Sequence, residues 1–598
     1  MMSQVIQHAE TDVVVLGMGA MSGTVAVEVA KAGYKVVGLE RGPYWDFNSD
    51  FFYTKYDEWG IGYMRKFDHS LATSSATVRN NRFQFALPVR RYTPTGQIIS
   101  EGYGVGGMAQ HYGGLMGRFA PWVYKMRSAT VERYGEAYLE AAVPHNDIQD
   151  WPLTYEDYLP YYKQWEKMWG ITGTNQGPFM PDSDYPLPPP PETPVGALFR
   201  DSAEALGYHP FPTPTSLASV PFTNTYGEKV NACVYDGWCG AACNYACEMG
   251  AKANSAYRTV PAAIRTGNLD LRLHCTVFRL DTDGTKKVTA ARYLDAQGNI
   301  HVQPGKVFFN GLWGFNLIRL MLLSGIGNPY DPASIEGSLG RGPAMGVGGA
   351  AVRGATGTLD NIGGNSYPAG NALGGGYTML DLADDNFDHA GLDFIGGSYV
   401  IVGSYPGGGP NNFGLYSRAP SPNTMGSAFK AGIKDAFLPQ KTSMNMRPSG
   451  MWPPTTDWFI DLDPHYVDKY GDPEPRLTMD WGMNTVKAAN YLAQKYVEIL
   501  QRMGASNVQL TDPVLTEDHM FAWPAHIRGG ARIGNDPNTS VFNKWHQCWT
   551  SENLFAAGEV CHPTGDNTTT GGTHPAGPTS YVAAEGIKKY LQSPGELV

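Results

Sequence analysis

Four of the seven cysteines lie close together, at Cys233, Cys239, Cys243 and Cys247. The last three recur at intervals of four residues, so a helix over this segment would align their thiols on one face. Three or four converging thiolates can hold an iron–sulfur cluster. However, the spacing matches neither the usual zinc pairs nor the ferredoxin runs. The segment therefore holds either a metal cluster or buried reduced thiols, and both interpretations stay open.

A glycine-rich turn near the N-terminus has the residues of a dinucleotide-binding unit. The apolar run Thr11–Leu16 predicts a buried parallel strand; the turn, a helical pattern and a second strand over 35–39 follow it. Glycines let the backbone approach a pyrophosphate at the helix N-terminus, and an acid after the second strand accepts a ribose hydroxyl. The predicted cofactor contacts in this unit are Gly17, Gly19, Ser22, Glu40 and Arg41.

Two further segments have the character of cofactor loops. Glycines between residues 101 and 117 are too dense for a regular helix and suit a backbone that passes close to a ligand. Near the C-terminus, the run 553–559 predicts a strand that ends in a glycine and an acid. These segments add Gly106, Gly107, Gly558 and Glu559 to the predicted contacts. The cofactor is therefore expected to contact both ends of the chain.

Composition and charge exclude several classes of protein. With 42% hydrophobic residues the chain can bury a substantial core, which excludes a mainly disordered state. A net charge of −11 argues against a nucleic-acid partner, which needs a basic face. No apolar run is long enough for a transmembrane helix, and residues 1–12 lack the features of a signal peptide. We expect a cytoplasmic protein, periplasmic only if a signal-bearing partner exports it.

Regular patterns elsewhere predict the elements that must position these residues. Helical stretches are expected from Asp147 to about Gly170, over 317–324 and over 486–503, and Thr154 is a candidate N-cap within the first of them. Short alternating runs at 457–462 and 476–479 predict antiparallel strands.

The order of these elements predicts an α/β fold in two parts. A Rossmann-type nucleotide domain is assembled from discontinuous segments, 1–335 and 516–598, with insertions at 43–98 and 150–225. A substrate domain, with a mainly antiparallel sheet and helices, is inserted over 336–515.

Several blocks of the sequence carry a family resemblance. They are GMGAMSG and LERGP near the N-terminus, the loop GGMAQHYGG, the helix end LMLLSG, and the C-terminal blocks AHIRGGARIG, NLFAAGEVCHPTG and GGTHPAGPTSYVAAEGI. Together they resemble the glucose–methanol–choline (GMC) oxidoreductases. RFAPW, IQDWPLTYEDYLPYY and CEMGAKANS are most similar to the flavoprotein subunits of bacterial gluconate 2-dehydrogenase and related sugar dehydrogenases. The resemblance implies the GMC fold, bound FAD and oxidation of an alcohol carbon.

Two histidines lie where the resemblance implies catalytic residues. Hydride transfer from a carbinol to flavin N5 requires the hydroxyl proton to leave, and a neutral imidazole is a suitable acceptor. His526 lies where the family has its catalytic base, and His574 where it has a paired histidine or asparagine. His562 is the reserve candidate. For each, the alternative is an ordinary hydrogen-bonded loop residue.

The resemblance also bears on the cofactors and partners. The loop around His111 is similar to the one through which pyranose oxidase attaches its flavin. Either FAD is linked covalently to His111, or His111 only lines the pocket of the isoalloxazine ring. Some sugar dehydrogenases of this kind carry a three-iron cluster in a place similar to the cysteine segment, which implies a 3Fe-4S or 4Fe-4S cluster here. A small subunit and a cytochrome c acceptor are the implied partners.

Three functions are consistent with the sequence. The first is a dehydrogenase that oxidises a sugar, sugar acid, glycoside or polyol and passes electrons to an external acceptor. The second is an oxidase that releases hydrogen peroxide from the same site. The third is a lyase that uses FAD structurally. Reduction of the flavin by alcohols separates the lyase from the other two, and peroxide release separates the oxidase from the dehydrogenase.

Overall fold

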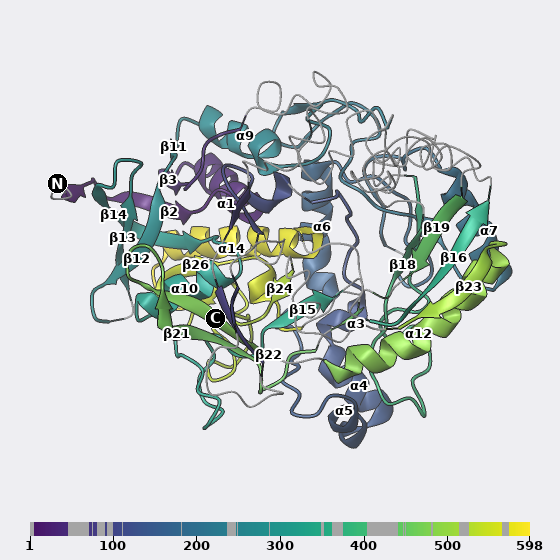
Figure 1. Ribbon diagram of the computed structural model, residues 1–598. Helices are drawn as coiled ribbons and strands as arrows, with labels where there is room; N and C mark the ends of the chain where they lie inside the picture. The colour runs from purple at the N-terminus through teal and green to yellow at the C-terminus, as the bar shows by residue number, and fades with distance from the viewer. Residues whose placement is uncertain are drawn as a thin grey trace, which may run out of the picture.

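The computed structural model has a mixed α/β fold, as the sequence predicts. It describes residues 5–45, 71–73, 76–80, 90–92, 100–110, 112–180, 182–235, 247, 249–285, 287–347, 352–360, 375–402, 441–446, 448, 450–451, 453–479, 482–512, 526–564 and 573–597. A mixed sheet lies at one side of the molecule and antiparallel strands with a long helix at the other (Figure 1).

The mixed sheet is built around the predicted strand–helix–strand unit. Its parallel strands, in spatial order, are β11 (Leu269–Arg272), β3 (Val36–Leu39), β2 (Thr11–Leu16), β14 (Ile300–Asn310) and β26 (Ser551–Ala556). Helix α1 (Ala20–Lys31) connects β2 to β3. The strand β26 comes from the C-terminal part of the chain, so both ends of the chain meet in one sheet, as predicted.

Apolar strands and helices bury this sheet. Val13, Val14 and Val15 of β2 have no exposed surface, as expected for a parallel strand covered on both faces. Helices α1 and α14 (Thr573–Gln592) pack together, and Val25 and Ile587 belong to the same core cluster. Beyond β14 the sheet continues antiparallel through β13 (Val288–Leu294) and β12 (Thr276–Thr282), and β1 (Val5–Gln7) joins the other end of β14 in parallel.

Several smaller sheets are mainly antiparallel. The sheets are β19 (Lys441–Met446), β16 (Gly354–Asp360) and β23 (Ser506–Thr511); β18 (Val400–Val402), β17 (Tyr377–Met379) and β8 (Phe211–Pro212); and β21 (Phe459–Val467), β22 (Pro473–Met479), β5 (Ala76–Asn80) and β6 (Arg90–Tyr92). Those of β16 and β17 lie on the side opposite the mixed sheet, and that of β21 lies beside the mixed sheet (Figure 1). Only β5 and β22 pair in parallel in these sheets. Helix α12 (Met483–Arg502) covers β16 and β23, with Leu492 and Ile499 fully buried (Figure 1).

The remaining elements are short, apart from two helices. They are β4 (Leu71–Thr73), β7 (Ser100–Gly102), η3 (Gly107–Gln110), α3 (Pro121–Tyr124), α4 (Met126–Tyr134), α5 (Glu136–Ala142), α6 (Tyr155–Trp169), α7 (Pro194–Ala205), β9 (Phe222–Thr223), β10 (Lys229–Val230), α8 (Ser255–Arg258), α9 (Val260–Arg265), α10 (Phe315–Leu323), β15 (Ala344–Val347), β20 (Gly450–Met451), β24 (Ile527–Arg528), β25 (Gln547–Cys548) and η8 (Glu559–Cys561). No helix in the described part of the chain is long and apolar enough to cross a membrane.

The predicted helices and strands are confirmed with small shifts at their ends. Helix α6 begins after Thr154, whose hydroxyl accepts from the Asp157 N–H in a capping box, and ends at Gly170 in a left-handed conformation. The helices expected at 317–324 and 486–503 are α10 and α12. The predicted antiparallel pair is β21 with β22.

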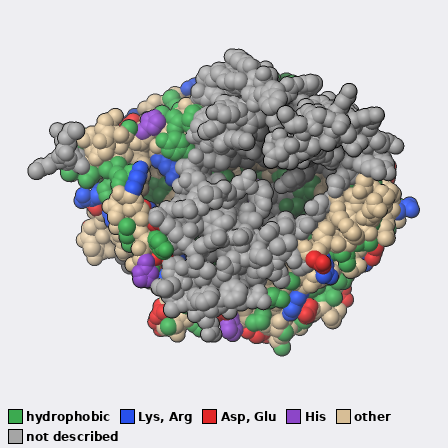
Figure 2. Space-filling model, viewed as in Figure 1, with side chains coloured by type: hydrophobic (Ala, Val, Ile, Leu, Met, Phe, Trp, Pro, Cys, Tyr) green, Lys and Arg blue, Asp and Glu red, His purple; other side chains and the backbone are tan. Residues whose placement is uncertain are grey.

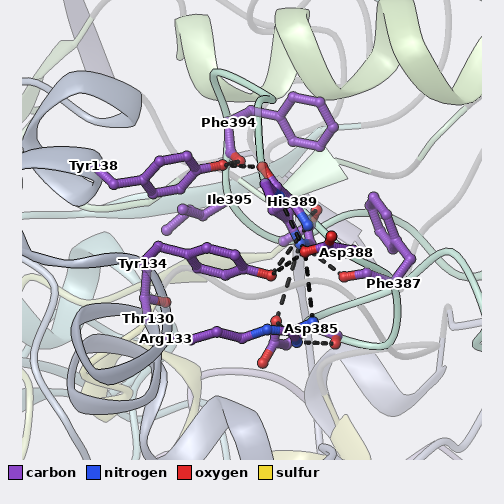
Figure 3. Close-up of polar contacts among 12 residues, drawn as sticks. Thr130, Arg133, Tyr134, Tyr138, Asp385, Phe387, Asp388, His389, Phe394 and Ile395 are labelled. Carbon is purple, nitrogen blue, oxygen red and sulfur yellow. Dashed lines mark hydrogen bonds and ion pairs between the residues drawn. The ribbon is translucent and has the colours of Figure 1, made fainter.

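A polar cluster joins helices α4 and α5 to the segment that carries Asp385 and His389 (Figure 3). Arg133 pairs with Asp385, at 2.8 Å between Nη1 and Oδ1, and the Tyr138 hydroxyl donates to the Phe394 carbonyl at 2.7 Å. His389 is buried against the rings of Phe387 and Phe394, which in turn contact Tyr491 of α12. This cluster fixes the segment of residues 385–394 to helices α4 and α5 by specific polar contacts.

The division at residues 336 and 515 stays a prediction. Two strands from outside that range, β5 and β8, pair with β22 and β17 inside it.

On the face shown in Figure 2, the described Lys and Arg side chains are dispersed among Asp and Glu.

Candidate active site

The predicted nucleotide turn is held by its acid. Gly17, with φ +75°, turns the chain after β2, and its N–H donates to the Leu39 carbonyl at 2.8 Å. Glu40 is buried and accepts from the backbone N–H of Met18 at 2.8 Å and of Gly42 at 2.9 Å. The carboxylate therefore fixes the turn to the end of β3 and lies beside the start of α1.

The start of helix α1 is an anion site with an unsatisfied hydroxyl. Gly19 is the N-cap, no side chain caps the helix, and the first turn holds no acid. Nothing lies within 4 Å of the position of a Cβ at Gly19. The buried Ser22 hydroxyl has no hydrogen-bond partner among the described residues. Free N–H groups at a helix N-terminus with an unused hydroxyl suit a pyrophosphate.

The second glycine loop lies directly against this turn. Gly106 forms a parallel bridge with Gly19 and its N–H donates to the Met18 carbonyl at 2.9 Å. A Cβ at Gly106, where φ is +103°, would lie 2.2 Å from Asn254 Oδ1. A Cβ at Gly107 would lie 3.3 Å from the Gly19 Cα. Only glycine permits this approach of two loops.

Sequence reasoning missed Asn254, which completes this junction. Its Oδ1 caps α8 by accepting from the Ala256 N–H at 2.8 Å. Its Nδ2 is buried and has no hydrogen-bond partner in the described structure. An unused amide donor and the unused Ser22 hydroxyl are the features expected where a polar cofactor binds. The CEMGAKANS block contains Asn254, but its spacing gave no sign of this role.

His111 lies outside the described residues, and its two neighbours are held by a lysine. The buried Lys252 ammonium donates to the carbonyls of Gln110 at 2.9 Å and Tyr112 at 3.0 Å. Arg41, the other predicted contact near this loop, donates from Nη2 to the Gly102 carbonyl at 3.3 Å.

The C-terminal loops bring His526 to Glu559. The two face each other at 3.0 Å between Nδ1 and Oε1, and the His526 side chain is 36% exposed. Hydrogen bonds from the backbone N–H of Gly529 and Ala531 to the carbonyls of Glu559 and Val560 hold the two segments side by side. Two predicted site residues from separate blocks therefore form a histidine–carboxylate pair.

His574 has a different environment. It begins helix α14, is fully buried, and its Nε2 lies 3.2 Å from Glu166 Oε1. Burial lowers the pKa of the His574 imidazole below its ordinary value, although Glu166 acts in the opposite direction. The structure shows no direct contact between His574 and His526.

The reserve candidate His562 is buried among aromatic rings. Its ring centroid lies 4.8 Å from that of Trp151 and 5.5 Å from that of Phe119, and neither ring nitrogen has a hydrogen-bond partner in the described part of the chain. Burial lowers the pKa of His562 well below its ordinary value, and Arg528 adds to this effect. His562 is therefore neutral at pH 7.

The cysteine segment is described only at its ends. Cys233 and Cys247 are of intermediate exposure, and the Lys252 N–H donates to the Cys247 sulfur at 3.4 Å. Cys239 and Cys243 lie outside the described residues. The described residues contain no group of three or more metal-binding side chains. The structure therefore gives no support for the iron–sulfur cluster and leaves the predicted ligand set incomplete.

Comparisons with known proteins agree with this geometry. No family model matches the chain. It is 33% identical to the gluconate 2-dehydrogenase flavoprotein of Pantoea cypripedii, over 98% of this chain and 95% of the relative. It is 24% identical to the fructose dehydrogenase large subunit of Gluconobacter japonicus, over 91% and 92%. The fold is similar to pyridoxine 4-oxidase from Mesorbium loti, with a TM-score of 0.57, 14% identity, and coverage of 98% of this chain and 100% of that one.

Proposed function

Because the chain belongs to the GMC oxidoreductases, in the branch of the gluconate 2-dehydrogenase flavoproteins, we propose that it is an FAD-dependent dehydrogenase of sugars, sugar acids, glycosides or polyols. It oxidises a primary or secondary alcohol and passes the electrons to an external acceptor. Its relatives are named dehydrogenases and oxidases, so a lyase that uses FAD only structurally does not fit.

One observation carries the cofactor part of the proposal. The unused Ser22 hydroxyl lies against Gly311, whereas the uncapped N-terminus of α1 and the unused Asn254 amide lie beside the loop of Gly106 and Gly107. These groups would hold the pyrophosphate of FAD, and Glu40 would fix the turn that receives its ribose. Bound FAD supplies the hydride acceptor; the protein supplies orientation and proton transfer.

The chain's own proton acceptor is best placed at His526. Its Nδ1 faces the Glu559 carboxylate, so in the neutral ring Nδ1 carries the proton and donates, and the Nε2 lone pair is free to accept. Of the three candidate histidines, His526 is the partly exposed one, whereas His562 and His574 are fully buried. A substrate hydroxyl can therefore reach His526, and Glu559 stabilises the imidazolium that forms.

Anaerobic flavin reduction tests the proposal. The FAD-loaded protein is mixed with a panel of sugars, sugar acids and polyols, and the oxidised flavin absorbance is followed. We expect at least one member of the panel to bleach the flavin, and an artificial electron acceptor to restore it. No bleaching by any member would contradict an alcohol dehydrogenase. Hydrogen peroxide formed in air, at the rate of substrate consumption, would assign an oxidase instead.

Three finer points extend the proposal. The first point is that FAD is attached covalently through His111. The second is that a small subunit and a cytochrome c receive the electrons. The third is that the cysteines from Cys233 to Cys247 hold an iron–sulfur cluster that conducts these electrons. The relative named as a large subunit supports the second point. Flavin that stays with the protein after acid precipitation checks the first. Iron and acid-labile sulfide in anaerobically purified protein check the third; full activity without iron would leave the cysteines structural.

A further inference from the structure

Helix α6 carries a buried ion pair for which the proposed function gives no role. Arg118 donates to both carboxylate oxygens of Glu166, from Nε at 2.6 Å and from Nη2 at 2.7 Å. The exposed fractions of the two side chains are 0% and 1%. Removing two charges from water costs several kcal/mol per ion, and well-packed apolar residues often replace such a pair without loss of stability. Stability alone therefore does not explain the pair.

The third member of this cluster is the candidate residue His574. Its Nε2 lies 3.2 Å from Glu166 Oε1, the same oxygen that receives Arg118 Nε. Among the described residues, neither ring nitrogen of His574 has an aligned hydrogen bond, so the 3.2 Å contact with Glu166 is chiefly electrostatic. The other titratable groups that face the ring among the described residues are Arg118, whose charge lowers the pKa of His574, and Tyr162 and Tyr185, whose ring centroids lie 5.3 Å and 6.4 Å away. Glu166 is therefore the anion beside His574.

Arg118 keeps that anion ionised and in place. Its Nη1 donates to the Tyr155 hydroxyl and to the Asp182 carbonyl, both at 3.1 Å, so the guanidinium is anchored on α6 and on the following loop. Burial alone would raise the pKa of the Glu166 carboxyl, but His574 and Arg118 lower it below its ordinary value. The carboxylate stays charged at pH 7 although water does not reach it.

We propose that Glu166, held by Arg118, is a positioning residue for His574: it fixes the ring and stabilises its protonated form. This inference rests on the proposed function, because it assigns a role in turnover only if His574 takes part. A developing alkoxide needs a second hydrogen-bond donor besides the base, and a ring that is held in place and favoured in its protonated form supplies one. Helix α6, far from the C-terminal block in sequence, thereby acts on the reaction through His574.

The test is the pH dependence of anaerobic flavin reduction, measured between pH 5 and pH 9. The limb that belongs to His574 is identified as the one that His574→Asn removes. Glu166→Gln removes the charge while keeping the shape, and we expect this limb to move to lower pH by about one unit, because an opposite charge this close shifts a pKa by roughly 1–3 units. Glu166→Asp keeps the charge and should restore most of the wild-type profile.

A matched control and a double variant separate positioning from folding. Glu585→Gln removes a carboxylate from the same pair of helices, where Tyr161 donates to Glu585 at 2.8 Å, and should leave the profile unchanged. In the His574→Asn background, Glu166→Gln should change the reduction rate by less than about twofold, since its effect passes through the ring. FAD content is measured for every variant, so a loss of cofactor is not mistaken for a loss of rate.

Heat denaturation of the FAD-loaded protein gives a readout that is independent of activity. If Glu166 stabilises protonated His574, the gap in Tm between wild type and Glu166→Gln widens as the pH falls from 8 to 5.5. A constant gap together with an unshifted kinetic limb would overturn the inference. A wild-type protein that no alcohol reduces would instead overturn the proposed function, and the Tm gap would still report on the contact.

Discussion

At the residue scale, the histidine–carboxylate pair makes a direct prediction for the base. His526→Ala should slow flavin reduction about 100-fold or more, the usual scale for losing a positioned base. The matched control is His209→Ala, because His209 also faces a carboxylate, at 2.7 Å from Asp381, but at an exposed position away from the glycine loops. Stopped-flow reduction under anaerobic conditions measures both. An unchanged rate in His526→Ala would exclude it as the base and direct attention to His562.

The residues that sequence could indicate are those that lie within recognisable blocks. His526 and Glu559 were each predicted separately, but their pairing was not, because they belong to different loops joined only in the fold. Asn254 and Glu166 gave no signal at all, since each acts on a residue far away in the sequence. The spacing of residues in the sequence indicates the strand, turn or helix that carries a residue. It does not indicate which residue, distant in the sequence, contacts that side chain in the folded protein.

At the element scale, the contact between the two glycine loops is a testable point of cofactor binding. Gly106→Ala places a methyl group at φ +103° and 2.2 Å from Asn254 Oδ1, so one loop must move away from Gly19. Strain of this kind costs about 1–3 kcal/mol, and we expect the Kd for FAD to rise by a factor of about 5 to 150. Titration with FAD measures it, on apoprotein prepared in a His111→Ala background so that no covalent link can form. Gly135→Ala, at φ +90° with nothing within 4 Å, should lower stability but leave the Kd unchanged.

The elements differ in how well the sequence predicts them, and the reason is the range of the contacts. The unit of β2, α1 and β3 is local, with an apolar strand, a glycine turn and a helix, so its pattern is complete within a short segment. Helix α6 was equally clear because Thr154 and Gly170 mark its ends. The pairing of β5 with β22 joins segments that are distant in sequence, and neither segment specifies the other.

At the scale of the whole molecule, buried histidines link stability to pH. Burial lowers the pKa of five described histidines, which are His8, His389, His546, His562 and His574. In the unfolded chain these groups take up protons near their ordinary pKa of about 6.5, whereas the folded chain does not. The stability that depends on their neutral form is therefore complete above pH 6.5 and is lost as the pH falls.

The contribution of His546 to this pH dependence of stability can be isolated. Burial lowers its pKa to about 4, although a hydrogen bond with the Ala556 carbonyl acts in the opposite direction. Between pH 7 and pH 5 the unfolded chain binds a proton at this position and the folded chain does not. This difference lowers the free energy of unfolding by about 2 kcal/mol. His546→Asn removes the titrating ring, and asparagine tolerates the left-handed backbone at φ +62°. We expect its Tm to fall less than that of the wild type on acidification.

The control is His145→Asn, which changes an exposed histidine with a similar φ of +56° and should keep the wild-type change of Tm with pH. If Tm changes equally with pH in wild type and His546→Asn, His546 is protonated in the folded protein at the acid end of the range. Burial would then not lower its pKa, contrary to the prediction.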